Sequence, residues 1–225
     1  MHRSLFAPAL AAALITVGTA TARADVMLGQ VDDFQDGTTQ NWVEGAPSPN
    51  PPTNVSTGGP AGAGDRFVQN ISTGGFGPGS RQIMFNQVQW TGDYIAAGVS
   101  GLEMDLINLG QTDMTIHITM VNNDLVNGLA AFSTTAGFNL PVGSGWQHAT
   151  FSLLPADMTL VAGSLNHEQV LSGITEVRIL ANNGPGFLGA PIAATLGTDN
   201  ITAIPEPAAA LGVVGLGALA LRRRR

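Results

Sequence analysis

Alternation of apolar and polar residues is the clearest pattern along the middle of the chain. In residues 114–120 every second residue from Met114 is apolar, and the residues between are Thr115, His117 and Thr119. Successive side chains of a β-strand point to opposite faces of its sheet. The pattern therefore predicts a strand with one face in the core and the other toward solvent.

A second alternating segment comes just before it. Residues 101–109 place apolar side chains on one face and Glu103 and Asp105 on the other. Residues 108–113 (NLGQTD) have the composition of a turn, so we expect the two segments to pair as a hairpin. Glu103, Asp105 and His117 would then share its outer face, either as a divalent-cation or sugar-contact patch or as an ordinary solvated surface.

Seven further segments are short, apolar or β-branched, and separated by turn residues. They are residues 30–34, 66–71, 81–90, 128–134, 146–153, 175–181 and 198–204. Roughly nine strands separated by turns predict an all-β fold, an antiparallel β-sandwich. One short helix is expected at residues 166–171, where Asn166 can cap the first turn, and the proline-rich residues 46–54 are expected to form an extended surface loop.

The segment from residue 25 to residue 204 is strongly acidic. Fifteen acids against three arginines give it a formal charge of −12. A surface of this sign repels phosphate backbones, so we expect no nucleic-acid partner. The chain has no cysteine, which excludes disulfides, thiolate nucleophiles and cysteine-ligated metal sites.

The first 24 residues have the composition of a signal peptide. A short basic start precedes an apolar stretch over residues 5–17, and Ala22 and Ala24 match the small-x-small rule for cleavage. We expect the cut after Ala24. A retained N-terminal anchor is the alternative, which the short apolar stretch and its Pro8 disfavour.

The C-terminus combines three features in order. Pro205, Glu206 and Pro207 come first, an apolar run follows over residues 208–221, and the chain ends in Arg222, Arg223, Arg224 and Arg225. The 14 residues of the run would span about 21 Å as a helix, against about 30 Å of bilayer hydrocarbon. The run is short for a lasting anchor, and the arginines would keep its end in the cytoplasm.

This combination resembles the PEP-CTERM sorting signal of Gram-negative bacteria. The resemblance implies a membrane-tethered intermediate, recognised by an exosortase-type enzyme and then released or transferred to the envelope, cell surface or exopolysaccharide matrix. The chain would divide into a signal peptide (1–24), an exported domain (25–204) and a sorting signal (205–225). An ordinary single-pass C-terminal anchor is the alternative, and both interpretations place the domain outside the inner membrane.

Three pieces of the exported domain carry a second resemblance. They are VDDFQDGTTQNW (31–42), LPVGSGWQHATFSL (140–153) and TDNITAI (198–204). They are similar to the edges of jelly-roll domains of the galactose-binding and carbohydrate-binding-module type, in which the first and last strands lie side by side and often share a structural calcium ion. The resemblance implies Asp32, Asp33 or Asp36 and Asp199 as the oxygen donors. Alternatively, these acids only solvate turns.

Residues for catalysis do not form a recognisable set. No serine lies in a Gly-x-Ser-x-Gly elbow, and the histidines at 117, 148 and 167 follow no zinc-ligand spacing. Sugar binding would use an exposed aromatic ring with polar groups around it. Trp146, which shares a side of its strand with His148 and Thr150, is the candidate ring, and a place in the core is its alternative.

Three functions follow from these observations. We expect first a non-catalytic exported envelope or matrix protein associated with exopolysaccharide. A carbohydrate-binding module is the alternative, and a glycan hydrolase on the same scaffold comes third.

Overall fold

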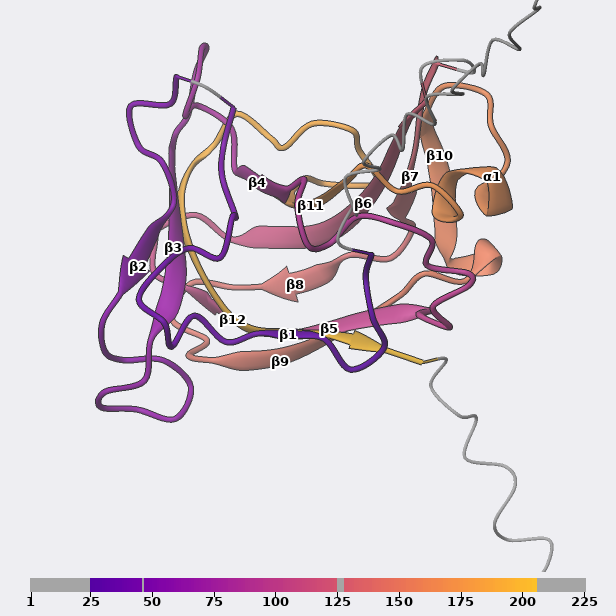
Figure 1. The fold of residues 1–225 in the computed structure, drawn as a ribbon. Coiled ribbons are helices and arrows are strands. Elements are labelled where there is room, and N and C mark those ends of the chain that lie inside the picture. The colour runs from indigo at the N-terminus through magenta and orange to yellow at the C-terminus, as the bar shows by residue number, and fades with distance from the viewer. Residues whose placement is uncertain (1–24, 46, 125–127, 206–225) are drawn as a thin grey trace, which may run out of the picture.

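A computed structural model describes residues 25–45, 47–124 and 128–205 of the chain. The predicted signal peptide, with Ala22 and Ala24, and the predicted sorting signal apart from Pro205 lie outside these residues. Two antiparallel sheets of six strands each pack face to face, with the two layers one above the other in Figure 1. The predicted all-β antiparallel sandwich is confirmed.

The first sheet has the strand order β2-β3-β12-β5-β9, and β1 also pairs with β12. Its strands are β1 (Val31–Asp32), β2 (Thr53–Val55), β3 (Phe67–Thr73), β5 (Gly101–Asn108), β9 (Gln147–Ser152) and β12 (Ala193–Ile204). The first and last strands therefore lie side by side, with Val31 opposite Thr202.

The second sheet has the order β10-β7-β6-β11-β4, with β8 also paired to β6. Its strands are β4 (Ile83–Asn86), β6 (Met114–Asp124), β7 (Gly128–Thr134), β8 (Phe138–Leu140), β10 (Met158–Ala162) and β11 (Glu176–Ala181). A 3-10 turn (Pro155–Asp157) and the helix α1 (His167–Leu171) complete the fold. Asn166 caps α1 as predicted, since its side chain accepts from the Gln169 backbone N–H.

The core lies between the sheets and is built from the alternating residues. Met104 and Leu106 of β5 and Ile116 and Ile118 of β6 are fully buried in one apolar cluster. Fully burying side chains of this size stabilises the fold by about 1.5–3 kcal/mol each. The alternation thus identified which side of each strand faces the core, but the prediction that the other side of residues 114–120 faces solvent is wrong, because His117 and Thr119 are buried as well.

The predicted pairing of the two alternating segments is wrong. Residues 101–108 form β5 in the first sheet and residues 114–124 form β6 in the second, so they face each other across the core. The connection bends away from β5 because Asn108 donates to the carbonyls of Thr112 and Leu140, and Thr112 donates to the carbonyl of Ala193. Alternation is the same for strands that pair and strands that face one another, so it cannot decide between them.

Three strands were not predicted from the sequence. β2 and β8 have three residues each, and β10 pairs only with β7 through an irregular register. β2 begins at Thr53, within the residues expected to form a loop. These strands are defined by backbone pairing with a longer neighbour and not by side-chain periodicity. Within the described residues, no helix is long and apolar enough to cross a membrane.

Candidate functional site

A pocket of about 240 Å³ lies at the β4 edge of the second sheet. Ile83 and Phe85 of β4 and Arg178 of β11 form its floor. Their direct neighbours in the two strands, Met84, Val177 and Ile179, point into the core. The pocket therefore lies on the outer face of the sheet. We call it the arginine pocket, because Arg81 and Arg178 both line it.

Three segments that are distant in sequence form the walls. Glu44 and Gly45 follow Val43, whose backbone exchanges hydrogen bonds with Phe85. Residues 74–79, here called the glycine loop, supply Gly77, Pro78 and Gly79. Leu188 comes from residues 182–192, here called the strap, which connects β11 to β12.

The strap runs along the outer face of the second sheet, as the orange loop near β4 and β11 in Figure 1. The Arg178 guanidinium lies 3.9 Å from the centre of the Phe187 ring and donates to the Phe187 carbonyl at 2.6 Å. Arg81 donates to the Gly189 carbonyl at 2.7 Å, and Thr119 donates to the Gly186 carbonyl at 2.8 Å. Side chains of the sheet thus hold three successive parts of the strap in place.

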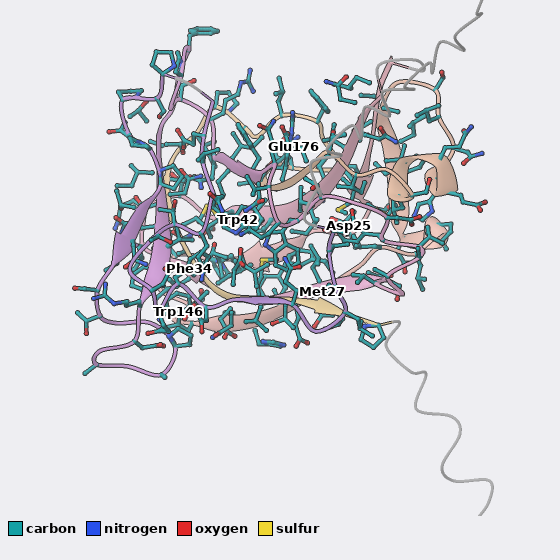
Figure 2. All side chains as sticks on the ribbon, in the orientation of Figure 1. Asp25, Met27, Phe34, Trp42, Trp146 and Glu176 are labelled. Atoms are coloured by element: carbon teal, nitrogen blue, oxygen red, sulfur yellow. The ribbon has the colours of Figure 1, made fainter. Side chains whose placement is uncertain are left out.

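The two arginines of the pocket differ in how their charge is balanced. Arg178 forms an ion pair with Glu176, which Figure 2 labels on the upper layer, and Gln87 donates to the same carboxylate. Arg81 has no ion-pair partner among the residues that the structure describes. Arg81 is therefore the pocket arginine whose guanidinium is not engaged in an ion pair with a described residue.

Glu44 brings an acceptor to the pocket. It is 7% exposed, and its Oε2 accepts from the Ser48 hydroxyl at 2.6 Å. Its Oε1 is buried without a hydrogen-bond partner, and burial raises the pKa of the carboxyl. An unpaired buried oxygen is costly, and a ligand hydroxyl would satisfy it.

An exposed aromatic residue is the neighbour in sequence of a residue that lines the pocket. Phe76 is fully exposed on the glycine loop, between the backbone of Gly75 and the pocket residue Gly77. Gly74, Gly75, Gly77 and Gly79 all have positive φ angles, a conformation that favours glycine. The pocket itself combines apolar walls with donors and an acceptor, a combination suited to the apolar face and hydroxyls of a sugar.

The residues predicted to contact sugar are divided between the two sheets. Glu103 and Asp105 lie on the outer face of the first sheet, and His117 is a buried residue of the second. His117 Nδ1 lies 2.8 Å from the Thr134 carbonyl, and Gly137 packs against its ring so closely that a Cβ there would be 2.5 Å from Nε2. Burial lowers the pKa of His117.

His148 takes the place expected for His117. Its Nδ1 lies 3.0 Å from Asp105 Oδ1, and its Nε2 lies 3.6 Å from Glu103 Oε2. The register of β9 against β5 sets these contacts, with His148 opposite Asp105. Alternation placed these three side chains on outer faces, but only the sheet order brought them together.

Trp146 immediately precedes β9, beside the first sheet (Figure 2). Its ring makes an edge contact with Phe67 at 5.2 Å between centroids, and its Nε1 donates to the Gly58 carbonyl at 2.9 Å. The ring is thus half-buried and engaged with the protein. It lies beside the first sheet, whereas the floor of the arginine pocket belongs to the second.

The four acids implied as calcium ligands differ in their surroundings. Asp32 is buried and its Oδ2 accepts from the indole N–H groups of Trp42 and Trp90, at 2.8 and 2.6 Å. Burial raises the pKa of Asp32, and these bonds oppose the shift. Asp36 accepts from the backbone and side chain of Thr38 in an exposed turn, bonds that lower its pKa.

Asp199 is the implied ligand with an oxygen to spare. It is fully buried, its Oδ1 accepts from the Asn200 N–H at 2.8 Å, and its Oδ2 has no hydrogen-bond partner. Burial raises its pKa to about 7, with further contributions from the charges of Asp65, Asp105 and Asp33. In the described part of the chain, no three Asp, Glu, His or Cys side chains come together as a metal site, so a calcium ion at Asp199 would also need other oxygens, such as backbone carbonyls.

Sequence reasoning missed Glu44, Phe76, Arg81 and Arg178 as site residues. The sequence does show that Arg66, Arg81 and Arg178 are the only basic side chains in this acidic segment. That scarcity is the one signal that could have drawn attention to them. Their convergence depends on the pairing of β4 with β11, which no local pattern reveals.

Comparisons with known proteins identify the fold. No protein-family model matches the sequence, and a search of curated proteins found no similar sequence. A solved family 11 carbohydrate-binding module from Clostridium thermocellum, in complex with a β-1,3-1,4-mixed-linked tetrasaccharide, is similar in structure with a TM-score of 0.52 at 12% identity, over 79% of this chain and 96% of that chain. A solution structure of CtCBM11 also has a TM-score of 0.52, at 14% identity over 83% and 98% of the two chains.

An exo-β-agarase gives a TM-score of 0.51 at 18% identity, over 81% of this chain. This chain spans 26% of the agarase. At these identities the similarity shows the fold alone: a two-sheet sandwich of the jelly-roll type found in carbohydrate-binding modules.

Proposed function

We propose that this protein is a non-catalytic carbohydrate-binding protein and that the arginine pocket holds a sugar ring of a polysaccharide. The observation that carries the proposal is the pocket itself: apolar walls, two guanidinium groups and an unpartnered carboxylate oxygen on the outer face of a sheet. The fold shared with carbohydrate-binding modules supports it.

The composition of the pocket favours binding over hydrolysis. Glycosidases use a pair of carboxyl groups on either side of the scissile bond. Among the described residues that line the pocket, Glu44 is the only acid. A volume of about 240 Å³ is below the range of about 300–1,000 Å³ typical of drug-sized ligands, which fits one ring with the rest of the polymer outside.

A glycan array with the full-length protein tests this function, and two variants test the site. Glu44→Ala removes the unpartnered acceptor and should weaken retention about tenfold. Glu103→Ala, on the other sheet, is the matched control and should bind like the parent. Retention of no glycan at all would reject the function. Loss in Glu103→Ala with binding intact in Glu44→Ala would move the site to the Glu103, Asp105 and His148 cluster.

We further propose that the domain acts outside the inner membrane. The apolar N-terminal segment ending at Ala24 and the Pro205, Glu206, Pro207 and arginine features of the C-terminus support export and processing by an exosortase-type enzyme. Delivery to the envelope or matrix would bring the pocket to extracellular polysaccharide, its proposed ligand.

A further inference from the structure

We propose that the arginine pocket selects a sugar ring bearing one anionic group, a uronate carboxylate or a sulfate ester, and that Arg81 is the residue that pairs with it. This inference rests on the proposed function and specifies the class of glycan. It is argued from where the few positive charges of the domain lie and from what already neutralises each of them.

Positive charge is concentrated at this pocket. Residues 25–204 contain three arginines and no lysine, and two of the three, Arg81 and Arg178, line one pocket of about 240 Å³. The third, Arg66, donates to the Asn54 side chain beside the first sheet. In a segment of formal charge −12, Arg81 and Arg178 are thus the two guanidinium groups of this pocket with which an anion could pair.

Arg81 is the arginine that remains available. Glu176 neutralises Arg178, whose guanidinium also stacks on Phe187. Arg81 makes one hydrogen bond, from Nη1 to the neutral carbonyl of Gly189, and no ion pair with any described residue. A guanidinium has five N–H donors in a planar fork, so Arg81 keeps donors that match the two oxygens of a carboxylate or sulfate.

The acids at the pocket limit the charge of the ligand. Glu44 lines the wall with a buried oxygen that lacks a donor, and Glu176 is already paired with Arg178. Glu44 therefore suits a sugar hydroxyl and would repel a second anionic group. One free cation beside one free acceptor matches a ring with a single anionic group and several hydroxyls.

The test uses pairs of glycans with the same sugar backbone, one acidic and one neutral. Binding of the full-length protein is measured by calorimetry to oligogalacturonate and its methyl ester, to hyaluronan and its methyl ester, and to dextran sulfate and dextran. The acidic member of at least one pair should bind about tenfold more tightly, and this preference should shrink as salt rises. The first two pairs report on a carboxylate and the third on a sulfate ester.

Three variants identify the residue. Arg81→Gln should lose the preference for the acidic member over the neutral one, and Arg81→Lys should keep part of that preference because the charge remains without the fork. Arg66→Gln, the third arginine, should behave like the parent. Melting temperatures show whether Arg81→Gln has loosened the fold, and the ratio of the acidic to the neutral affinity is the quantity compared with the parent.

The outcomes separate this inference from the function on which it rests. Equal affinity for both members of all three pairs, or an acidic preference that survives in Arg81→Gln, overturns the inference and leaves glycan binding standing. Failure to bind any glycan, acidic or neutral, overturns both.

Discussion

Two buried aspartates show how differently the same residue type can be accommodated. Asp32 accepts hydrogen bonds from Trp42, Trp90 and Gln89, so its burial is compensated. Asp199 receives one backbone bond and keeps one oxygen without a partner. Because an uncompensated buried charge is costly, Asp199 is the carboxyl whose ionisation should most disfavour the folded state.

We therefore expect stability to depend on pH through Asp199. Its pKa is about 7 in the folded protein against 3.8 for the free group, so the folded state holds the proton more tightly. The free energy of unfolding should fall as pH rises from about 4 to 7, by up to about 4 kcal/mol from this group. Asp199→Asn should remove that slope, and thermal unfolding in a chelating buffer at pH 5 and pH 8 measures it.

The expected sign is specific. At pH 8 Asp199→Asn should melt at a higher temperature than the parent, and the difference should shrink as pH falls toward and below 3.8, where the parent carboxyl becomes protonated in both states. Asp36→Asn, in an exposed turn, is the control and should lack this gain at pH 8. A parent and an Asp199→Asn variant with equal slopes would contradict the assignment.

Calcium gives a separate prediction for the same carboxyl. If Asp199 Oδ2 is a ligand, millimolar calcium should raise the melting temperature of the parent at pH 8, since an ion bound only to the folded state stabilises it. Asp199→Asn should lose that response. If the melting temperature of the parent is the same in calcium and in chelator, Asp199 is not part of the calcium site that the resemblance implies.

At the scale of elements, the strap and the edge strand β4 together create the pocket. Gly189 lies so close to the chain before β4 that a Cβ there would be 2.2 Å from the Gln82 carbonyl oxygen. Ala190 accepts from the Gln82 N–H on the same side. The strap can follow this path only with glycine at position 189.

Gly189→Ala should displace the strap and with it Leu188 and the Gly189 carbonyl that anchors Arg81. We expect a loss of about 1–3 kcal/mol in the free energy of unfolding and weaker glycan binding, read by thermal unfolding and calorimetry. Gly184→Ala is the matched control in the same strap, because its Cβ would meet nothing within 4 Å. Equal effects of the two substitutions would show that the close approach at Gly189 is unimportant.

At the scale of the whole molecule, we propose an acidic domain between two terminal segments that are removed by processing. The domain and the termini can be tested independently, since the proposed glycan binding involves only the pocket. The order signal peptide, domain and sorting signal predicts two cleavages in the exporting cell.

Mass spectrometry of the protein isolated from its native envelope tests both cleavages at once. The mature chain should begin at Asp25 and should lack Arg222, Arg223, Arg224 and Arg225. Intact protein with the terminal arginines, extracted only with detergent, would instead favour an ordinary C-terminal anchor. The precursor expressed without its exporting machinery is the control and should keep both ends.

The sequence by itself determined the class of fold and the side of β5 and β6 that faces the core. Alternation around Met104 and Ile116 is a local property, set by the direction of successive side chains, and burial of apolar surface makes it decisive. The Asn166 cap is local in the same way. These features depend on residues within a few positions of one another.

Only the tertiary structure decided which strands are neighbours, and the site depends on that choice. Register sets Arg178 opposite Phe85, and sheet order places His148, not His117, beside Asp105. Hydrogen bonds between distant backbone segments make these choices, and alternation is equally satisfied whichever strands pair. The pocket therefore depends on the pairing of strands that are distant in sequence, whereas the core-facing residues can be predicted from the alternation of apolar residues along each strand.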